Sequence, residues 1–305
     1  MDDISLIAGS AYAFIGFFPV PLYARIIWVF LKHSEFRGHQ CYFLMAQIGI
    51  FDCLVILGEA TFGVTVASDH HLFGLTEYIG IPVAAAAWMA MLGVNLVLSV
   101  NRLKVLCELE IPLLFDKMLM WASWLFGFFF LFSYASRLSP LIISEDGLSF
   151  FYDMDISYAV VVEHCELYSA IMILGFTFLI YVYVIGHIIK QRTKFSASKT
   201  AVRTQEIILL GQSLFVFVIC CFLEITWNIG DYILPASPWS GCVVNAVFIL
   251  HSGWINPGIC LIFNTKVRRS VFNQNSQKMF AKSVMLNRSV FVNAATPSTM
   301  PKTAG

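Results

Sequence analysis

Four ionisable side chains stand inside long apolar stretches of this 305-residue chain: Asp52, Glu59, Glu224 and His251. Placing an acid at the depth of a lipid bilayer costs about 2.5–3.5 kcal/mol even on lenient insertion scales. Such residues therefore face a protein interior or a water-filled cavity, where they bind ligands or take part in conformational changes. The pattern predicts a polar site enclosed by an apolar protein.

The residue types suggest two kinds of polar site. Asp52 and Asn256 are expected either to fix helix packing through hydrogen bonds or to act in switching as well, and the residues alone leave both open. Glu59, Glu224 and His251 are expected to face a ligand cavity. A lone histidine in an apolar helix is, however, more often a packing residue than a ligand contact.

Transmembrane helices are the elements that must hold these residues. The chain is 58% hydrophobic and 12% charged, with a mean hydropathy of +0.76, whereas soluble domains carry about 25% charged residues. A bilayer-spanning helix needs about 20 mostly apolar residues. Seven continuous apolar runs meet this need: 5–31, 41–67, 78–100, 118–136, 167–189, 207–232 and 242–263. We therefore expect an all-α membrane protein with a seven-transmembrane helix bundle, because a barrel would show short alternating strands instead.

Basic residues lie almost entirely on one side of these spans. All Lys and Arg residues except Arg25 and Arg137 fall in the loops after the first, third and fifth spans or in the C-terminal segment. Cytoplasmic loops are enriched in Lys and Arg. The distribution predicts an extracellular N-terminus and a cytoplasmic C-terminus, with the basic face against anionic lipid of the inner leaflet.

The longest outer loop is expected at residues 138–166, between the fourth and fifth spans. Asp146-Gly147 separates two β-prone arms there, which is a signal for a two-residue hairpin turn. The segment predicts either a short hairpin over the mouth of the bundle or an irregular loop. Cys165 and Cys242 are the two cysteines expected near the outer surface, and they either form a disulfide or remain thiols.

A short amphipathic helix is expected after the seventh span. Phe263, Val267 and Val271 share one helical face, and basic residues face away from it, which is typical of a helix lying on a membrane surface. The segment beyond Asn275 is polar and without periodicity. We therefore expect a seven-transmembrane domain with an eighth helix at residues 1–272 and a disordered cytoplasmic tail at 273–305.

Several helix motifs resemble those of rhodopsin-like G-protein-coupled receptors. Residues 48–52 (IGIFD) resemble that family's second-helix motif, and Asn101-Arg102 stands where the family has Asp-Arg-Tyr. Residues 226–229 resemble its Cys-Trp-x-Pro motif without the proline. Asn256-Pro257 begins a segment similar to its Asn-Pro-x-x-Tyr, with Cys260 in the tyrosine position.

The departures from that pattern narrow the resemblance. Asn101 replaces the usual aspartate, the first helix lacks the family's Gly-Asn pair, and no cysteine begins the third helix. This reduced pattern, over about residues 5–272, is similar to the nematode serpentine chemoreceptors of the class T, class X and class XA groups. The resemblance implies a chemosensory (olfactory) receptor of the plasma membrane, with a sensory cilium as a compatible location, whose partners are a small-molecule ligand, membrane lipid and a heterotrimeric G protein.

The resemblance also implies roles for single residues in a two-state bundle. Arg102, next to Asn101, would face a cytoplasmic cleft that opens for the G-protein α-subunit when the sixth helix moves outward. Asp52 and Asn256 would form a buried polar relay, and Pro257 would let the seventh helix change shape. Trp227 would lie beneath the ligand cavity and transmit ligand contact to the sixth helix.

The ligand is expected to be small and weakly polar, because the cavity should be apolar with isolated polar anchors. Alanines occupy residues 84–87 in the outer half of the third span, and no aspartate there offers an ion pair to a charged amine. The residues predict no cofactor and no metal, and nucleic acid is not an expected partner.

The main alternative is a membrane transporter or an ion- or proton-conducting protein that uses Asp52, Glu59, Glu224 and His251. The lack of internal repeats argues against it. A retinal-binding light receptor needs a lysine within a helix, and residues 242–263 contain none. An enzyme is not expected, because the chain carries no HExxH, Gly-x-Ser-x-Gly or phosphate-loop motif.

Overall fold

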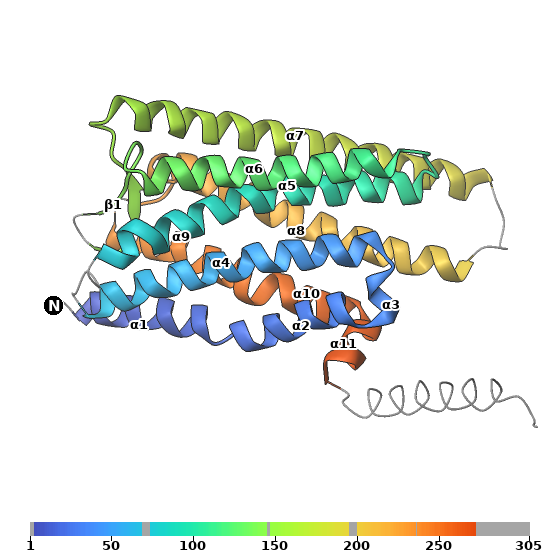
Figure 1. The fold of residues 1–305 in the computed structure, drawn as a ribbon, viewed down its shortest axis with the longest axis horizontal. Helices are drawn as coiled ribbons and strands as arrows, with labels where there is room; N and C mark the ends of the chain where they lie inside the picture. Colours follow the sequence, from blue (N-terminus) through green and yellow to red (C-terminus); the bar gives the residue numbers. More distant parts are fainter. Residues whose placement is uncertain (1–2, 69–73, 145–146, 195–199, 236, 273–305) are drawn as a thin grey trace, which may run out of the picture.

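The computed structural model describes residues 3–68, 74–144, 147–194, 200–235 and 237–272. Within these residues, seven helical spans are long and apolar enough to cross a membrane, and they form one elongated bundle (Figure 1). This confirms the predicted fold class. The predicted tail at 273–305 lies outside the described residues.

Two of the first four spans, the first and the third, are irregular next to a proline. The first span joins α1 (Asp3–Phe17) to α2 (Val20–Lys32) and breaks at Pro19, because proline lacks an N–H and disturbs the helical hydrogen-bond ladder. The others are α4 (Gln40–Ser68), the π-helical turn η2 (Thr76–Gly80) with α5 (Ile81–Leu106), and α6 (Leu113–Ala135).

The last three spans differ in length. They are α7 (Ser157–Lys194), α8 (Thr200–Ile233), and a composite of α9 (Pro238–Leu250), the π-helical turn η3 (His251–Ile255) and α10 (Asn256–Phe263). Helix α7 begins ten residues before the expected span, so Glu166 lies in a helix and not in a loop. The helix can start early because no glycine or proline interrupts residues 157–174.

The two ends of the bundle carry different small elements (Figure 1). The start of α1 and the strands β1 (Leu141–Ile143) and β2 (Phe150–Tyr152) lie at one end, which we call the hairpin end. The helices α3 (Ser34–Arg37) and α11 (Thr265–Phe272) lie at the other, which we call the basic end. In α11 the two valines are buried and the basic residues exposed, which confirms the predicted amphipathic helix. Phe263, expected on the same face as these valines, is instead the last residue of α10 and is exposed.

The predicted hairpin is confirmed and covers one end of the bundle. The strands pair antiparallel, with Leu141 opposite Tyr152, and Gly147 adopts the left-handed φ of +71° that a tight turn requires. The carbonyl oxygen of the buried Leu148 accepts hydrogen bonds from Tyr12 Oη (3.4 Å) and Asn245 Nδ2 (3.2 Å). These contacts tie the hairpin to α1 and α9.

The disulfide considered between Cys165 and Cys242 is not formed in the structure. Cys165 lies on the exposed surface of α7, whereas Cys242 is buried at the start of the seventh span.

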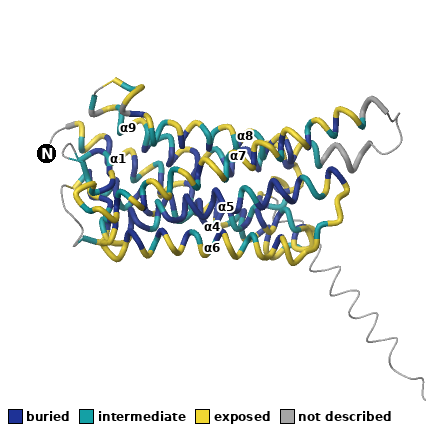
Figure 2. The backbone as a smooth tube through the Cα atoms, turned by 90° about the horizontal axis from the view of Figure 1, so that it is seen from above, coloured by how far each residue is buried: buried dark blue, intermediate teal, exposed yellow. Residues whose placement is uncertain are grey.

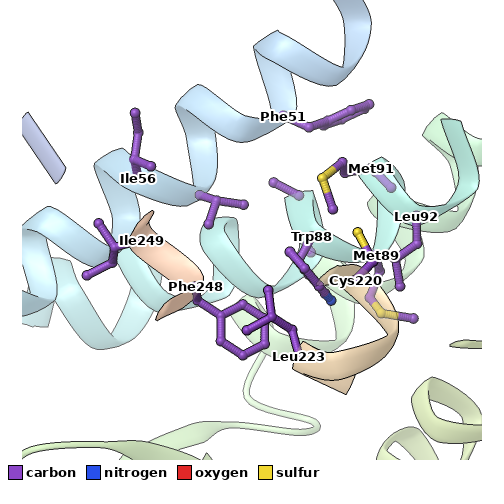
Figure 3. Packing of buried hydrophobic residues seen from close by; sticks show 14 of the residues in the cluster. Phe51, Ile56, Trp88, Met89, Met91, Leu92, Cys220, Leu223, Phe248 and Ile249 are labelled. Atoms are coloured by element: carbon purple, nitrogen blue, oxygen red, sulfur yellow. The ribbon is translucent and has the colours of Figure 1, made fainter. Parts of the chain in front are cut away.

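Helix α5 is the centre of the bundle, and most of its span is buried (Figure 2). Its residues Trp88, Met89, Met91 and Leu92 belong to one buried cluster with residues of α4, α8 and α9 (Figure 3). Because lipid tails are as apolar as these side chains, close packing contributes more to helix association in a membrane than escape from water does. Close packing around α5 therefore fixes the positions of its side chains relative to the neighbouring helices.

Small residues allow α1 and α4 to approach closely, which gives a first prediction. A Cβ added to Gly63 would lie 2.6 Å from Ala13 N and from Tyr12 Cβ. We expect Gly63→Ala to lower the free energy of unfolding by about 1–3 kcal/mol through overpacking. Thermal unfolding of the purified protein in detergent measures this loss.

The matched control for this substitution is Gly175→Ala in α7. A Cβ at Gly175 would meet nothing within 4 Å, so this change should leave the melting temperature unchanged or raise it slightly, since alanine favours a helix. Equal melting temperatures for the two variants would contradict the importance of the close α1–α4 contact.

Candidate functional site

Two adjoining cavities lie beneath the hairpin. The smaller, which we call the aromatic chamber, has a volume of about 40 Å³ and is lined by Val55, Glu59, Ala84, Ala85, Trp88, Phe150, Glu166, Trp227, Asn245 and Phe248. The larger, which we call the mouth chamber, has a volume of about 390 Å³. The two share four lining residues: Phe150, Glu166, Trp227 and Asn245.

Four aromatic rings frame the aromatic chamber. Trp88 of α5 packs edge-on against Phe248 of α9 with ring centroids 4.7 Å apart (Figure 3). Trp227 of α8 lies 5.9 Å from Phe248 and 5.5 Å from Phe150, measured between ring centroids. The chamber therefore connects the hairpin to α5, α8 and α9 through aromatic contacts.

The predicted ligand-cavity residues divide into two groups. Glu59 and Trp227 line the aromatic chamber. Glu224 and His251 line neither chamber: Glu224 Oε1 accepts a hydrogen bond of 2.5 Å from Trp88 Nε1, and the fully buried His251 ring lies 5.6 Å from the Trp88 ring. These two residues therefore support Trp88 and do not face the cavity.

The structure adds Glu166 to the cavity, which the sequence analysis placed in a loop. Its Oε2 accepts a hydrogen bond of 2.8 Å from Tyr134 Oη, whose hydroxyl lies 2.9 Å from that of Tyr152. The buried residues Ala159, Val162 and Ala170 share a helical face with Glu166. That periodicity was the available signal that Glu166 faces the protein interior.

A second polar site, the Asp52 cluster, lies deeper in the bundle. The fully buried Asp52 accepts hydrogen bonds at Oδ2 from Tyr23 Oη (2.5 Å) and Asn256 Nδ2 (2.9 Å). These bonds join α2, α4 and α10. Asp52 Oδ1 and Asn256 Oδ1 are buried without a hydrogen-bond partner among the described residues, as is the hydroxyl of Ser252.

The seventh span changes its helical geometry next to this cluster. The π-helical turn His251–Ile255 ends directly before Asn256-Pro257. Pro257 has no N–H and cannot complete the α-helical ladder, so a local irregularity is expected at this point. The sequence prediction that Pro257 lets this helix change shape stays a prediction.

A large cleft opens at the basic end, with a volume of about 930 Å³. Arg102 of α5 and Glu206 of α8 both line it and form an ion pair of 2.5 Å between Nη1 and Oε2. The Arg102 side chain is fully buried, and that of Glu206 is 27% exposed. The neighbouring Asn101 Oδ1 has no hydrogen-bond partner among the described residues, so Arg102 is paired across the cleft and not within its own helix.

Glu206 was not among the predicted site residues, although the sequence carries a signal for it. Glu206 is the only acidic residue between Lys190 and Leu223. An isolated acid in a basic segment next to an apolar span is expected to form an ion pair with a particular basic residue. Only the fold shows that this partner is Arg102.

The comparisons with known proteins agree with this architecture. The family model "Serpentine type 7TM GPCR chemoreceptor Srt" matches residues 3–284. The chain belongs to the Srt family of serpentine chemoreceptors. The crystal structure of squid rhodopsin resembles this Srt receptor with a TM-score of 0.73 at 11% sequence identity, covering 99% of this chain and 93% of that chain. No curated protein sequence matches the chain.

Family membership confirms the resemblance to the nematode chemoreceptors, including the class T group. This Srt receptor is therefore a multi-pass, seven-helix membrane receptor, and both its family and its fold are those of receptors and not of enzymes. At 11% identity, the likeness to squid rhodopsin concerns the fold alone.

The Asp52 cluster of this Srt receptor gives a second prediction. Tyr23→Phe removes one of the two donors to Asp52 Oδ2 and leaves a buried carboxylate less well satisfied. We expect the variant to lose about 1–3 kcal/mol of unfolding free energy, measured by thermal unfolding in detergent. Tyr168→Phe, on the exposed face of α7, should have no effect; a similar loss from both would rule out a special contribution of the cluster.

Proposed function

We propose that this Srt receptor is a G-protein-coupled chemosensory receptor of the plasma membrane that binds a small molecule in the two chambers. Its hairpin end would be extracellular and its basic end cytoplasmic. The concentration of Lys and Arg at and beyond the basic end supports this orientation. The mouth chamber would then open to the outside and the large cleft to the cytoplasm.

The observation that carries the proposal is the ion pair between Arg102 and Glu206 across the basic-end cleft. It links α5 to α8 beside a cavity large enough to receive part of another protein. A heterotrimeric G protein would bind once this pair separates. The pair therefore defines a closed state, and a ligand can favour the open state only by binding that state more tightly.

Helix α8 offers a physical connection between the two ends. On α8, Trp227 lines the aromatic chamber and Glu224 accepts a hydrogen bond from Trp88. Glu206 lies on the same helix near the basic end. A ligand that displaces Trp88 or Trp227 would change the contact between α5 and α8. Because a helix moves largely as a rigid element, that change would alter the separation of Arg102 and Glu206.

Expression of the receptor with a panel of G-protein sensors and a small-molecule library tests the proposal. The expected result is ligand-dependent G-protein activation that Trp227→Ala reduces at matched surface expression. Ion flux through the purified protein in liposomes, without any G-protein response, would instead support the transporter or channel alternative and contradict this proposal.

A further inference from the structure

We propose that the ligand carries a positively charged organic ammonium group, which binds in the aromatic chamber beside Glu59. This inference rests on the proposed receptor function and specifies its ligand class. It replaces the sequence-based expectation of a weakly polar ligand, because the structure brings acids and aromatic rings from separate helices into one chamber.

Glu59 is a buried acid that faces the aromatic chamber. Its side chain lines the aromatic chamber and is only 5% exposed, and its Oε2 has no hydrogen-bond partner among the described residues. A buried acid without a partner either takes up a proton or is paired with a cation. None of the described residues that line either chamber is a lysine, arginine or histidine, so a cationic ligand would supply the counter-charge that favours the ionised form of Glu59.

One further carboxylate lines the chamber, and another lies behind its wall. Glu166 lines both chambers, and only its Oε2 is engaged by Tyr134. Glu224 lies behind Trp88 and accepts the hydrogen bond of its indole N–H. Negative groups that converge on a cavity with low-dielectric walls raise the local concentration of cations.

The aromatic rings favour an organic cation over a metal ion. An ammonium group within about 6 Å of the centre of a Trp, Tyr or Phe ring is attracted by the ring quadrupole. Trp88, Trp227, Phe150 and Phe248 provide such rings on several sides. Metal ions need several oxygen, nitrogen or sulfur ligands, and the described part of the chain contains no group of three or more His, Cys, Asp or Glu side chains that could hold one.

The cavity volumes suggest how such a ligand is arranged. The aromatic chamber, at about 40 Å³, has room for roughly three water-sized groups, since one water needs about 10–15 Å³ of such volume. That space suits a compact ammonium head group. The adjoining mouth chamber, at about 390 Å³, would hold the remainder of the molecule.

The test is the charge selectivity of a thiol placed in the aromatic chamber by Ala85→Cys. The full chain, with Cys165→Ala to remove an exposed thiol, is placed in lipid nanodiscs. Its reaction rates with trimethylammonium-ethyl and sulfonatoethyl methanethiosulfonate, a cation and an anion, are compared. The cation preference is the rate with the cation divided by the rate with the anion, normalised to the same ratio for a small thiol in solution. We expect this preference to be about ten or more.

A matched pair of variants assigns this selectivity to Glu59. In the same background, Glu59→Gln should lower the cation preference by about fivefold. Asp155→Asn removes an exposed acid at the hairpin end and should change the preference by less than about twofold, because solvent and salt screen it. Val55→Cys, another lining position, replaces Ala85→Cys if that variant does not fold.

Small probe molecules that occupy the chamber should protect the introduced thiol from modification. Tetramethylammonium should slow the modification, whereas the uncharged neopentyl alcohol and Na⁺ or Ca²⁺ at equal ionic strength should not. A cation preference near one, equal protection by the alcohol, or protection by a metal ion alone would overturn the proposal. The reaction needs no G protein, so this result and the test of receptor function can fail independently.

Discussion

Glu206→Gln is expected to raise ligand-independent G-protein activation by about 5–30-fold, because it removes the charge that holds Arg102 of α5 to α8. The pair joins a fully buried arginine to a partly exposed carboxylate. We assign about 1–2 kcal/mol to the pair after allowing for solvent screening of Glu206. A free-energy change of that size alters the ratio of open to closed receptor by about 5–30-fold. Nucleotide exchange on the purified G protein measures the increase.

The control for charge alone is Glu110→Gln. Glu110 is exposed in the segment between α5 and α6 and does not line the basic-end cleft. This variant should keep the basal rate of the wild-type receptor. If Glu206→Gln also leaves basal exchange unchanged while both proteins couple to the G protein, the ion pair does not hold the closed state.

Arg102→Ala is expected to reduce ligand-stimulated signalling to about a tenth or less at matched surface expression. Arg102 is the buried cation of α5 that lines the cleft. Once released from Glu206, it would present its guanidinium group to the G protein, and a cation with several donors forms strong, directional hydrogen bonds. The variant should therefore lose coupling even though the closed-state pair is also lost.

Two comparisons separate this role from general effects. Arg268→Ala removes an exposed cation of α11 that does not line the cleft, and it should signal normally. The double variant with Glu206→Gln should be as inactive as Arg102→Ala alone, since opening the cleft does not replace the missing guanidinium. Full signalling by Arg102→Ala at equal expression would contradict the assigned role.

The apolar patterning of the chain was sufficient to predict the bundle. Seven spans, the hairpin around Gly147 and the amphipathic α11 were all expected and are all present. Each follows from a local property: span length, turn chemistry or helical periodicity. The start of α7 was missed because hydropathy detects the lipid-buried part of a helix and not its polar extension.

The site was only partly predictable, because its chemistry depends on which helices meet. Glu59 was recognised as a buried acid, but its position among the rings of Trp88, Trp227 and Phe248 follows from helix packing alone. The positions of Glu224 and His251 behind Trp88 were likewise not accessible from their spacing. The Arg102–Glu206 pair joins residues 104 positions apart, and no local pattern specifies such a contact.

The most direct test of the receptor account is the distance between α5 and α8 at the basic end. Spin labels at the exposed positions Val105 and Ile208, introduced by Val105→Cys and Ile208→Cys in nanodiscs, report it by pulsed electron paramagnetic resonance. The account predicts a longer distance when a nucleotide-free heterotrimeric G protein is bound and a larger population of that distance in Glu206→Gln without it. A single unchanged distance in the free, G-protein-bound and Glu206→Gln states would contradict it.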